Sequence, residues 1–154
     1  MAIQQNESKA RPTVLALDLE GTLISNAASQ IPRPGFFLFL EWCRHAFPRI
    51  VMFTTVDEPR FRKIAALLVE EGLAPQWFSQ LEYVSWTGGV KDLAFIAHAH
   101  IEDVLLVDDH VGYVHPDQMQ QWVEVECFSY PYSDQDAGLE HVRDRLTARL
   151  RGRT

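Results

Sequence analysis

The feature that most constrains this chain is a set of short apolar runs, each followed directly by a polar side chain. The runs are 13–17 before Asp18, 50–53 before Thr54, and 103–107 before Asp108. Short continuous apolar runs are typical of strands buried on both faces of a parallel sheet. Because ligands bind outside the carboxyl ends of strands in open α/β sheets, we expect the three polar side chains to meet in one crevice.

Helix signals alternate with these runs. Apolar residues crowd 35–47, and a cap followed by a proline predicts a second helix over 57–72. Helical signals resume at Lys91, and an amphipathic helix is predicted over 134–150. A further strand is predicted over 122–125.

The segment 75–90 is rich in aromatic and β-branched residues and fits a short strand or hairpin. The alternation of strands and helices predicts an α/β fold, a Rossmann-like three-layer α/β/α domain with a mainly parallel sheet. We expect a polar, flexible leader over 1–12 and a single domain over 13–154, since no repeat or long linker divides the chain.

Composition excludes several classes of protein. The 154 residues carry a formal charge of −7, which argues against a general nucleic-acid binder. No stretch approaches the roughly 20 apolar residues of a membrane span, and the start has no signal-peptide core. The two cysteines, Cys43 and Cys127, lack the spacing of a metal site or disulfide framework. We therefore expect a reduced, cytoplasmic protein without a membrane partner.

The polar residues fit phosphoryl transfer. A carboxylate at a strand end can attack phosphorus and form an aspartyl-phosphate intermediate, and Asp18 is placed for this role. Glu20 would protonate the leaving oxygen and later activate water. Thr54, Lys91 and the backbone N–H groups that follow Asp18, beginning with Leu19, would balance the charge of the phosphoryl group.

Acids beside a phosphate would repel it unless a hard cation lay between them. Mg²⁺ prefers carboxylate and carbonyl oxygens together with water. The predicted ligands are the side chains of Asp18 and Asp108 and the backbone carbonyl of Glu20. Asp109 either joins them, orients them or caps the next turn.

The chain resembles a known superfamily at these residues. The segment 18–22 (DLEGT), Phe53-Thr54, Lys91 and 107–109 (VDD) occur in the order of the four haloacid-dehalogenase motifs. The sequence looks like the NLI-interacting-factor-like branch, small phosphatases related to those acting on the RNA polymerase II tail. The cues for this branch are Arg33-Pro34-Gly35, Phe53-Thr54, 91–93 and 106–109.

The resemblance covers about residues 13–130 and implies a role for each matching residue. Asp18 would be the nucleophile and Glu20 the general acid and base. Thr54 and Lys91 would bind phosphate, and Asp108 and Asp109 would hold Mg²⁺. The intervals 18–54 and 54–91 leave no room for a large cap domain.

An open site of this kind suits a bulky substrate. A phosphoprotein is favoured, and a nucleic-acid end or a metabolite stays open. Trp77, Tyr83 and Trp86 either grip the substrate or pack in the core. His98, His100, His110 and His115 lack metal-ligand spacing, and only His110 is expected near the site.

One residue departs from the family pattern, since Glu20 stands where aspartate is usual. The extra methylene moves the carboxyl by about one C–C bond, and a misplacement of about 1 Å can cost on the order of 10²-fold in rate. Either the backbone compensates or turnover is slow. Two alternatives to an efficient phosphatase follow: a catalytically weak, phosphate-binding adaptor, or a phosphotransferase that uses an acceptor other than water.

Overall fold

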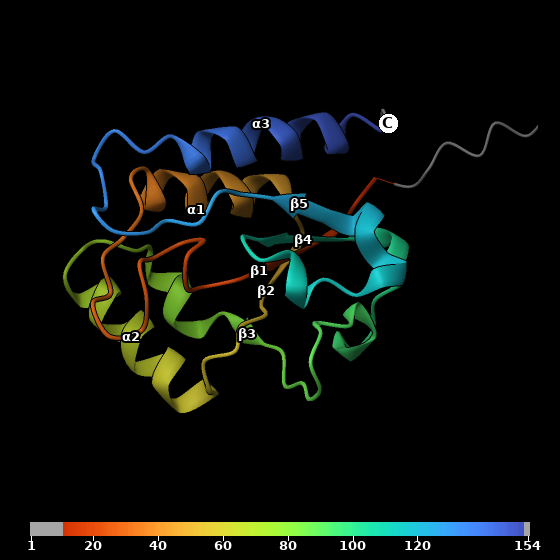
Figure 1. The fold of residues 1–154 in the computed structure, drawn as a ribbon, viewed down its shortest axis with the longest axis horizontal. Coiled ribbons are helices and arrows are strands. Elements are labelled where there is room, and N and C mark those ends of the chain that lie inside the picture. Colours follow the sequence, from red (N-terminus) through yellow and green to blue (C-terminus); the bar gives the residue numbers. More distant parts are fainter. Residues whose placement is uncertain (1–10, 153–154) are drawn as a thin grey trace, which may run out of the picture.

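The computed structural model describes residues 11–152, so the leader predicted over 1–12 lies almost wholly outside the described residues. The described chain forms one five-stranded parallel sheet with the order β3-β2-β1-β4-β5 (Figure 1). In chain order the strands are β1 (Val14–Leu17), β2 (Arg49–Met52), β3 (Glu82–Tyr83), β4 (Val104–Asp108) and β5 (Trp122–Glu124). The predicted α/β class with a parallel sheet is confirmed.

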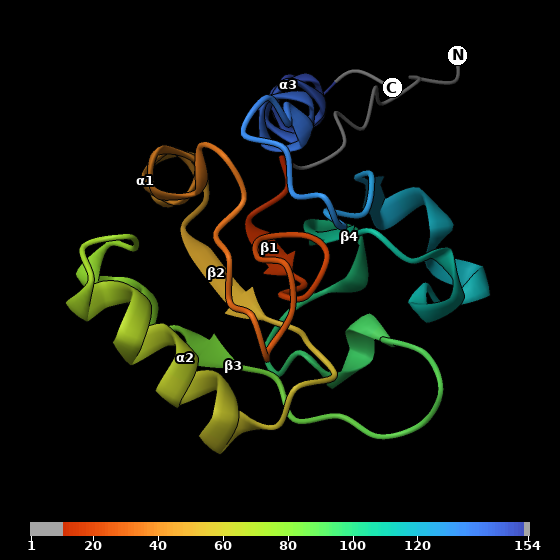
Figure 2. The same ribbon diagram turned by 60° about the vertical axis from the view of Figure 1, so that its left-hand side comes forward.

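Three α-helices pack on one face of the sheet: α1 (Phe36–Ala46), α2 (Glu58–Glu70) and α3 (Gly138–Leu150). Because side chains alternate along a strand, β1 sends Leu15 and Leu17 to this face and Val14 and Ala16 to the other. Figure 2 shows α1 and α3 on one side of the strands and the long segment after β3 on the other.

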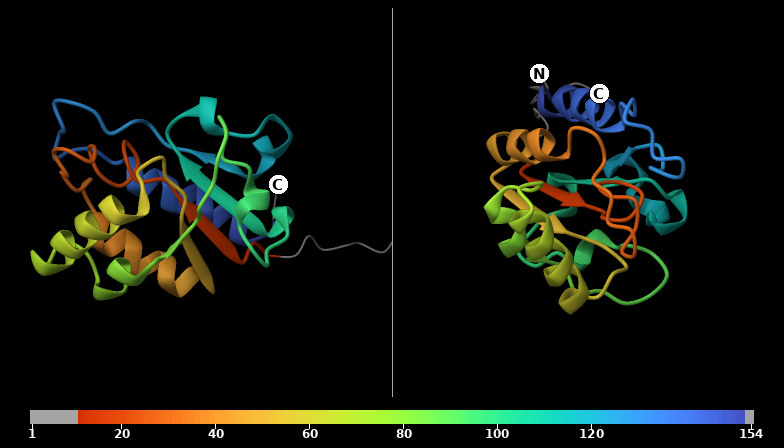
Figure 3. Two further views of the ribbon diagram at one scale, coloured as in Figure 1. Left: turned by 90° about the horizontal axis from the view of Figure 1, so that it is seen from below. Right: turned by 90° about the vertical axis from the view of Figure 1, so that its left-hand side faces the viewer.

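The opposite face is covered by irregular chain and short 3₁₀ turns. Leu93 and Ile96 pack there on the sheet, and Figure 3 (left) shows the segment after β3 crossing this face. The helical signals at Lys91 yield only the 3₁₀ turn Leu93–Phe95. The backbone of His98 has a φ of 57°, which lies outside the helical range and prevents an α-helix from continuing.

The helix predictions hold with small changes at the ends. The Asp57 side chain accepts a hydrogen bond from the Arg60 N–H at 2.9 Å and so caps α2, which ends before Gly72 at a φ of 73°. The helix predicted from residue 134 begins only at Gly138. Within residues 11–152, no helix is both long and apolar enough to cross a bilayer.

The centre of the sheet places the site. The chain passes outward from β1 to β2 and β3, and then returns to the other side of β1 to form β4. The carboxyl end of β1 therefore lies where the direction of winding reverses, the usual position of a ligand crevice in such folds.

Candidate active site

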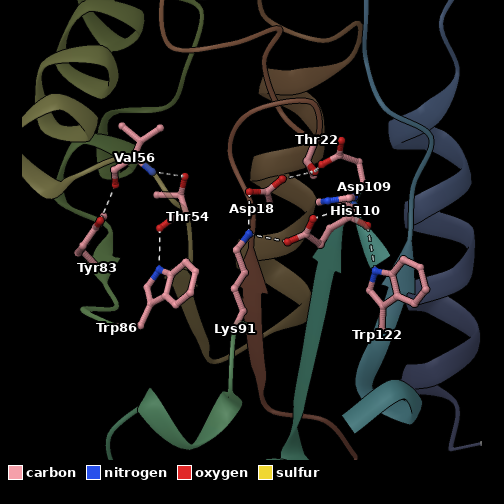
Figure 4. Close-up of polar contacts among 11 residues, drawn as sticks. Asp18, Thr22, Thr54, Val56, Tyr83, Trp86, Lys91, Asp109, His110 and Trp122 are labelled. Atoms are coloured by element: carbon pink, nitrogen blue, oxygen red, sulfur yellow. Dashed lines mark hydrogen bonds and ion pairs between the residues drawn. The ribbon is translucent and has the colours of Figure 1, made fainter. Parts of the chain in front are cut away.

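A buried cluster of opposite charges occupies the carboxyl end of β1. The Nζ of Lys91 donates to Asp18 Oδ1 at 2.9 Å and to Asp108 Oδ2 at 2.5 Å (Figure 4). Asp18 follows β1, Asp108 is the last residue of β4, and Lys91 comes from the segment between β3 and β4. All three side chains are buried, so the fold brings together three of the predicted site residues.

Tyr113 fixes the position of Lys91. The backbone N–H of Lys91 donates to the Tyr113 carbonyl at 2.7 Å, and Nζ lies 5.2 Å from the centre of the Tyr113 ring. An ammonium group has three donors, and two of them are used by Asp18 and Asp108. In the part of the chain that the structure describes, the third finds no hydrogen-bond acceptor and stays available to a ligand.

Asp108 is held by donors on both its side chain and its backbone. Its Oδ1 accepts from the His110 N–H at 2.9 Å, and its carbonyl oxygen accepts from the Trp122 indole N–H at 2.9 Å (Figure 4). The His110 ring packs edge-on against Tyr113 with 5.0 Å between centroids. His110 thus lies beside the site, as expected, and shapes it through its backbone.

Three acids gather closely enough to bind a cation. One carboxylate oxygen from each of Asp18, Asp108 and Asp109 lies within 4.8 Å of the others. The Thr22 hydroxyl lies between Asp18 Oδ2, at 2.8 Å, and Asp109 Oδ1, at 3.2 Å. Hard carboxylate oxygens at this spacing fit a hard divalent cation such as Mg²⁺.

The electrostatics of the cluster also favour a cation. Burial raises the pKa of Asp18 well above its usual value, and it raises the pKa of Asp108, in both cases against the pull of Lys91. Burial works against the charged form of Lys91, but the two carboxylates outweigh it and raise the pKa of the amine. When all three acids are ionised they outnumber the single ammonium, and a divalent ion would neutralise this excess of negative charge.

The loop after Asp18 leaves backbone groups open to a ligand. The Leu19 carbonyl accepts from Leu23 N at 2.9 Å and from Ile24 N at 3.2 Å, which folds the loop back on itself. Within residues 11–152, the backbone N–H groups of Leu19 and Glu20 have no acceptor, and the Glu20 carbonyl has no donor. The Leu19 N–H is the predicted phosphate contact and the Glu20 carbonyl the predicted metal ligand, and both stay predictions.

The structure does not bring the Glu20 carboxylate to the buried cluster. Its Oε2 accepts from the Ala27 backbone N–H at 2.7 Å, so the side chain is turned toward the loop that precedes α1. Among the described residues, Glu20 makes no hydrogen bond to Asp18, Lys91 or Asp108. In this conformation it supports the loop rather than the reacting centre.

Thr54 lies at the carboxyl end of the neighbouring strand, two residues beyond β2. Its hydroxyl oxygen accepts from the Val56 N–H at 3.1 Å, which leaves the hydroxyl proton free to donate. The Trp86 indole N–H donates to its carbonyl at 2.8 Å, and the Tyr83 hydroxyl donates to the Val56 carbonyl at 2.5 Å (Figure 4). Trp86 and Tyr83 therefore position the Thr54 turn.

Sequence reasoning gave no role to Arg33, the residue that holds the first motif in place. Its guanidinium pairs with Asp136 at 2.6 and 3.1 Å and donates to the carbonyls of Gly21 and Thr22 at 3.3 Å each. The only local signal is an arginine before Pro34-Gly35, since its partner lies 103 residues away. A buried arginine with four such contacts locks the loop to the start of α3.

Gly21 is the close-approach point of this loop. Its φ is +74°, and a Cβ added there would lie 2.5 Å from Asp109 Oδ2. A larger residue would push Asp109 away from the other acids, so glycine is required for the cluster to close.

Comparison with known proteins shows the family of the chain. The profile of the NLI interacting factor-like phosphatase family matches residues 13–153. A hypothetical protein from Xanthomonas campestris has a crystal structure with a TM-score of 0.49 and 15% identity over 94% of this chain and 86% of that chain. No curated protein gives a significant match. Since the profile spans nearly the whole sequence, the chain belongs to the NLI interacting factor-like phosphatase family.

Proposed function

We propose that this chain is a Mg²⁺-dependent phosphomonoesterase of the haloacid-dehalogenase type that works through an aspartyl-phosphate at Asp18. The observation that carries the proposal is the buried cluster of Asp18, Lys91 and Asp108 at the carboxyl end of β1. Lys91 donates two of its N–H groups to carboxylates and keeps the third free, which suits a site that binds a phosphate anion.

The reaction has two steps. A carboxylate oxygen of Asp18 attacks phosphorus, the bond from phosphorus to the leaving oxygen breaks, and the leaving oxygen takes up a proton. Water then attacks the phosphorus of the aspartyl-phosphate and gives a proton to the proposed base Glu20, while the bond from phosphorus to the Asp18 oxygen breaks and releases inorganic phosphate. Lys91, the Thr54 hydroxyl and the Leu19 N–H hold the phosphoryl oxygens through both steps.

Mg²⁺ would be held by the carboxylates of Asp18 and Asp108 and the carbonyl of Glu20, with Asp109 as a further ligand or as the residue that orients them. When bound, the ion neutralises charge that would otherwise repel the phosphate. Thr22 donates to Asp18 and contacts Asp109, which keeps the acids in register for the ion.

Glu20 is the proposed acid and base, and its carboxylate must leave the Ala27 N–H to act. This contact favours two alternatives: a catalytically weak, phosphate-binding adaptor, or a phosphotransferase in which the acceptor supplies what Glu20 does not. Glu20→Asp separates the first of these from the enzyme. An increase in turnover points to an impaired native site, and a decrease shows that the glutamate is tuned for its role. To separate the phosphotransferase from the phosphatase, the amount of free phosphate released is compared with the amount of phosphorylated acceptor formed.

The test of the proposal is phosphate release from a generic aryl phosphate and a phosphopeptide panel, with and without Mg²⁺. Asp18→Asn removes the attacking charge, so we expect kcat to fall on the order of 10⁴-fold or more. Asp144→Asn, an exposed aspartate of α3, is the matched control and keeps wild-type turnover. Wild-type protein that binds Mg²⁺ but releases no phosphate from any substrate would contradict the enzyme and favour the adaptor.

The substrate of the enzyme is proposed to be a phosphoprotein, because the intervals that carry cap domains in this superfamily are short here. A nucleic-acid end and a metabolite are the competing substrates, and the same assay ranks them.

A further inference from the structure

A cavity adjoins the proposed phosphate site at Thr54. It has a volume of about 590 Å³ and is open to solvent. Its lining includes Thr54, Asp57, Glu58, Tyr83, Trp86 and Tyr113. Since Thr54 belongs to both sites, whatever enters this cavity lies next to the phosphoryl group.

The walls of the cavity are aromatic and firmly placed. Trp86 and Tyr113 meet edge to face with 6.5 Å between centroids, and Trp86 is tied to the Thr54 carbonyl through its indole N–H. Tyr83 stacks on Phe61 of α2 and donates to the Val56 carbonyl. The ring faces therefore keep their positions when a ligand enters, which lowers the entropic cost of binding.

The rim of the cavity is acidic. Asp57 and Glu58 stand exposed at the start of α2, and no cationic side chain lines the cavity within residues 11–152. Burial raises the pKa of the Tyr83 hydroxyl, and the charges of Glu58 and Asp57 raise it further, so both carboxylates act on this wall. Glu58 also pairs with Arg62 at 3.4 Å in a partly exposed contact, so the charge of Asp57 is the less compensated of the two.

Aromatic rings beside acidic side chains attract organic cations and repel polyanions. We propose that this cavity binds a lysine or arginine side chain next to the phosphorylated residue, so that the preferred substrate is a basic phosphopeptide. The inference rests on the proposed phosphatase function, whose site supplies the neighbouring phosphate contact. The same charges disfavour a nucleic-acid strand, whose phosphates would meet Asp57 and Glu58.

The experiment compares phosphoserine peptides that differ at one position. A single lysine is moved from two residues before the phosphoserine to two residues after it, and each peptide is paired with one that has norleucine in place of lysine. Norleucine keeps the alkyl stem without the charge. We expect the best lysine peptide to exceed its partner about five- to tenfold in kcat/KM at low salt, and the ratio to fall toward one at high salt.

Variants then locate the effect. The double variant Asp57→Asn with Glu58→Gln removes both charges, while asparagine still caps α2. The expected result is a lysine-to-norleucine ratio close to one. Glu70→Gln with Glu71→Gln makes the same change of charge at the exposed far end of α2, and this control keeps the ratio.

Two readouts keep this inference separate from the proposed function. Turnover of the aryl phosphate without any lysine preference would overturn the inference and leave the phosphatase standing. If no substrate is turned over, fluorescence anisotropy of labelled peptides bound to the wild-type protein still decides, because equal affinities for lysine and norleucine peptides would overturn it. Faster turnover of a 5′-phosphorylated oligonucleotide than of every phosphopeptide would also count against it.

Discussion

Two fully buried cations, Lys91 and Arg33, show how the same kind of group serves different ends in one small domain. Arg33 gives its donors to Asp136 and to the carbonyls of Gly21 and Thr22, and all of these partners are protein atoms. Lys91 contacts two carboxylates and keeps one donor free. Arg33, held by one carboxylate and two carbonyls, fixes the loop that carries Asp18, whereas Lys91, set among carboxylates, faces the place where a phosphate would bind.

The comparison gives a physical criterion for separating structural from functional buried charge. A buried cation whose partners are one carboxylate and backbone carbonyls behaves as part of the architecture, and its removal leaves unpaired groups behind. A buried cation in an acidic cluster with shifted pKa values is a candidate for a functional role. Removing each cation in turn tests this distinction.

The largest effect is expected from Lys91→Met. The variant removes the positive charge beside the phosphoryl group, so kcat/KM should fall on the order of 10³-fold, equivalent to about 4 kcal/mol of activation free energy. Steady-state kinetics with an aryl phosphate measures it, and Lys63→Met at an exposed position of α2 is the control. A loss below tenfold would place Lys91 with Arg33 as a structural cation.

Arg33→Met is expected to act on stability instead. It leaves Asp136 and the two loop carbonyls without their hydrogen-bond donor. The free energy of unfolding should therefore fall by about 3 kcal/mol, as measured by urea denaturation. Arg49→Met breaks an exposed two-pronged pair with Glu82 and should cost less than about 1 kcal/mol. If both variants lose the same free energy of unfolding, burial does not increase the contribution of Arg33 to stability.

The smallest effect concerns the pH dependence of the Arg33 pair. Partial burial tends to raise the pKa of Asp136, but the hydrogen bonds and charge of Arg33 lower it below its usual value. The ionised carboxylate therefore stabilises the fold above the pKa it has when unfolded, and this contribution disappears as pH falls through the lowered folded value.

Asp136 is partly exposed, with 20% of its side chain open to solvent, so solvent screening keeps the contribution below about 1 kcal/mol. Urea denaturation of wild type and Asp136→Asn at pH 7 and near pH 3 measures it, and the difference between the two proteins should shrink at the lower pH. A difference that stays constant over this range would mean that the pair does not depend on ionisation of Asp136.

Much of the fold and part of the site could be predicted from the sequence because the signals are local. Apolar runs before Asp18, Thr54 and Asp108 mark strand ends, and parallel strands bring their carboxyl ends to one edge. The caps at Asp57 and Gly72 delimit α2 within two residues. The roles assigned to these site residues remain predictions that the kinetics above would test.

The rest depends on contacts between distant residues. The position of Lys91 is set by its contacts with Tyr113 and Asp108. The helix expected after Lys91 is replaced by a short 3₁₀ turn that packs on the sheet. The late start of α3 coincides with the contacts of Asp136, which binds Arg33 and the Gly138 N–H. The Glu20 carboxylate turns to Ala27 for a backbone partner that no sequence pattern shows.

The uneven covering of the sheet has a consequence for how this enzyme family can diversify. Asp18 follows a strand that is paired on both sides and covered on one face by the α-helices. Lys91, Trp86 and Tyr113 lie outside the α-helices and strands. Insertions between them break few repeating backbone hydrogen bonds, so they cost little as long as Tyr113 still holds Lys91 and Trp86 still holds the Thr54 turn. A designer who wishes to retarget the protein can therefore graft new segments around Trp86 and Tyr113, keep Lys91, and leave the Asp18 frame untouched.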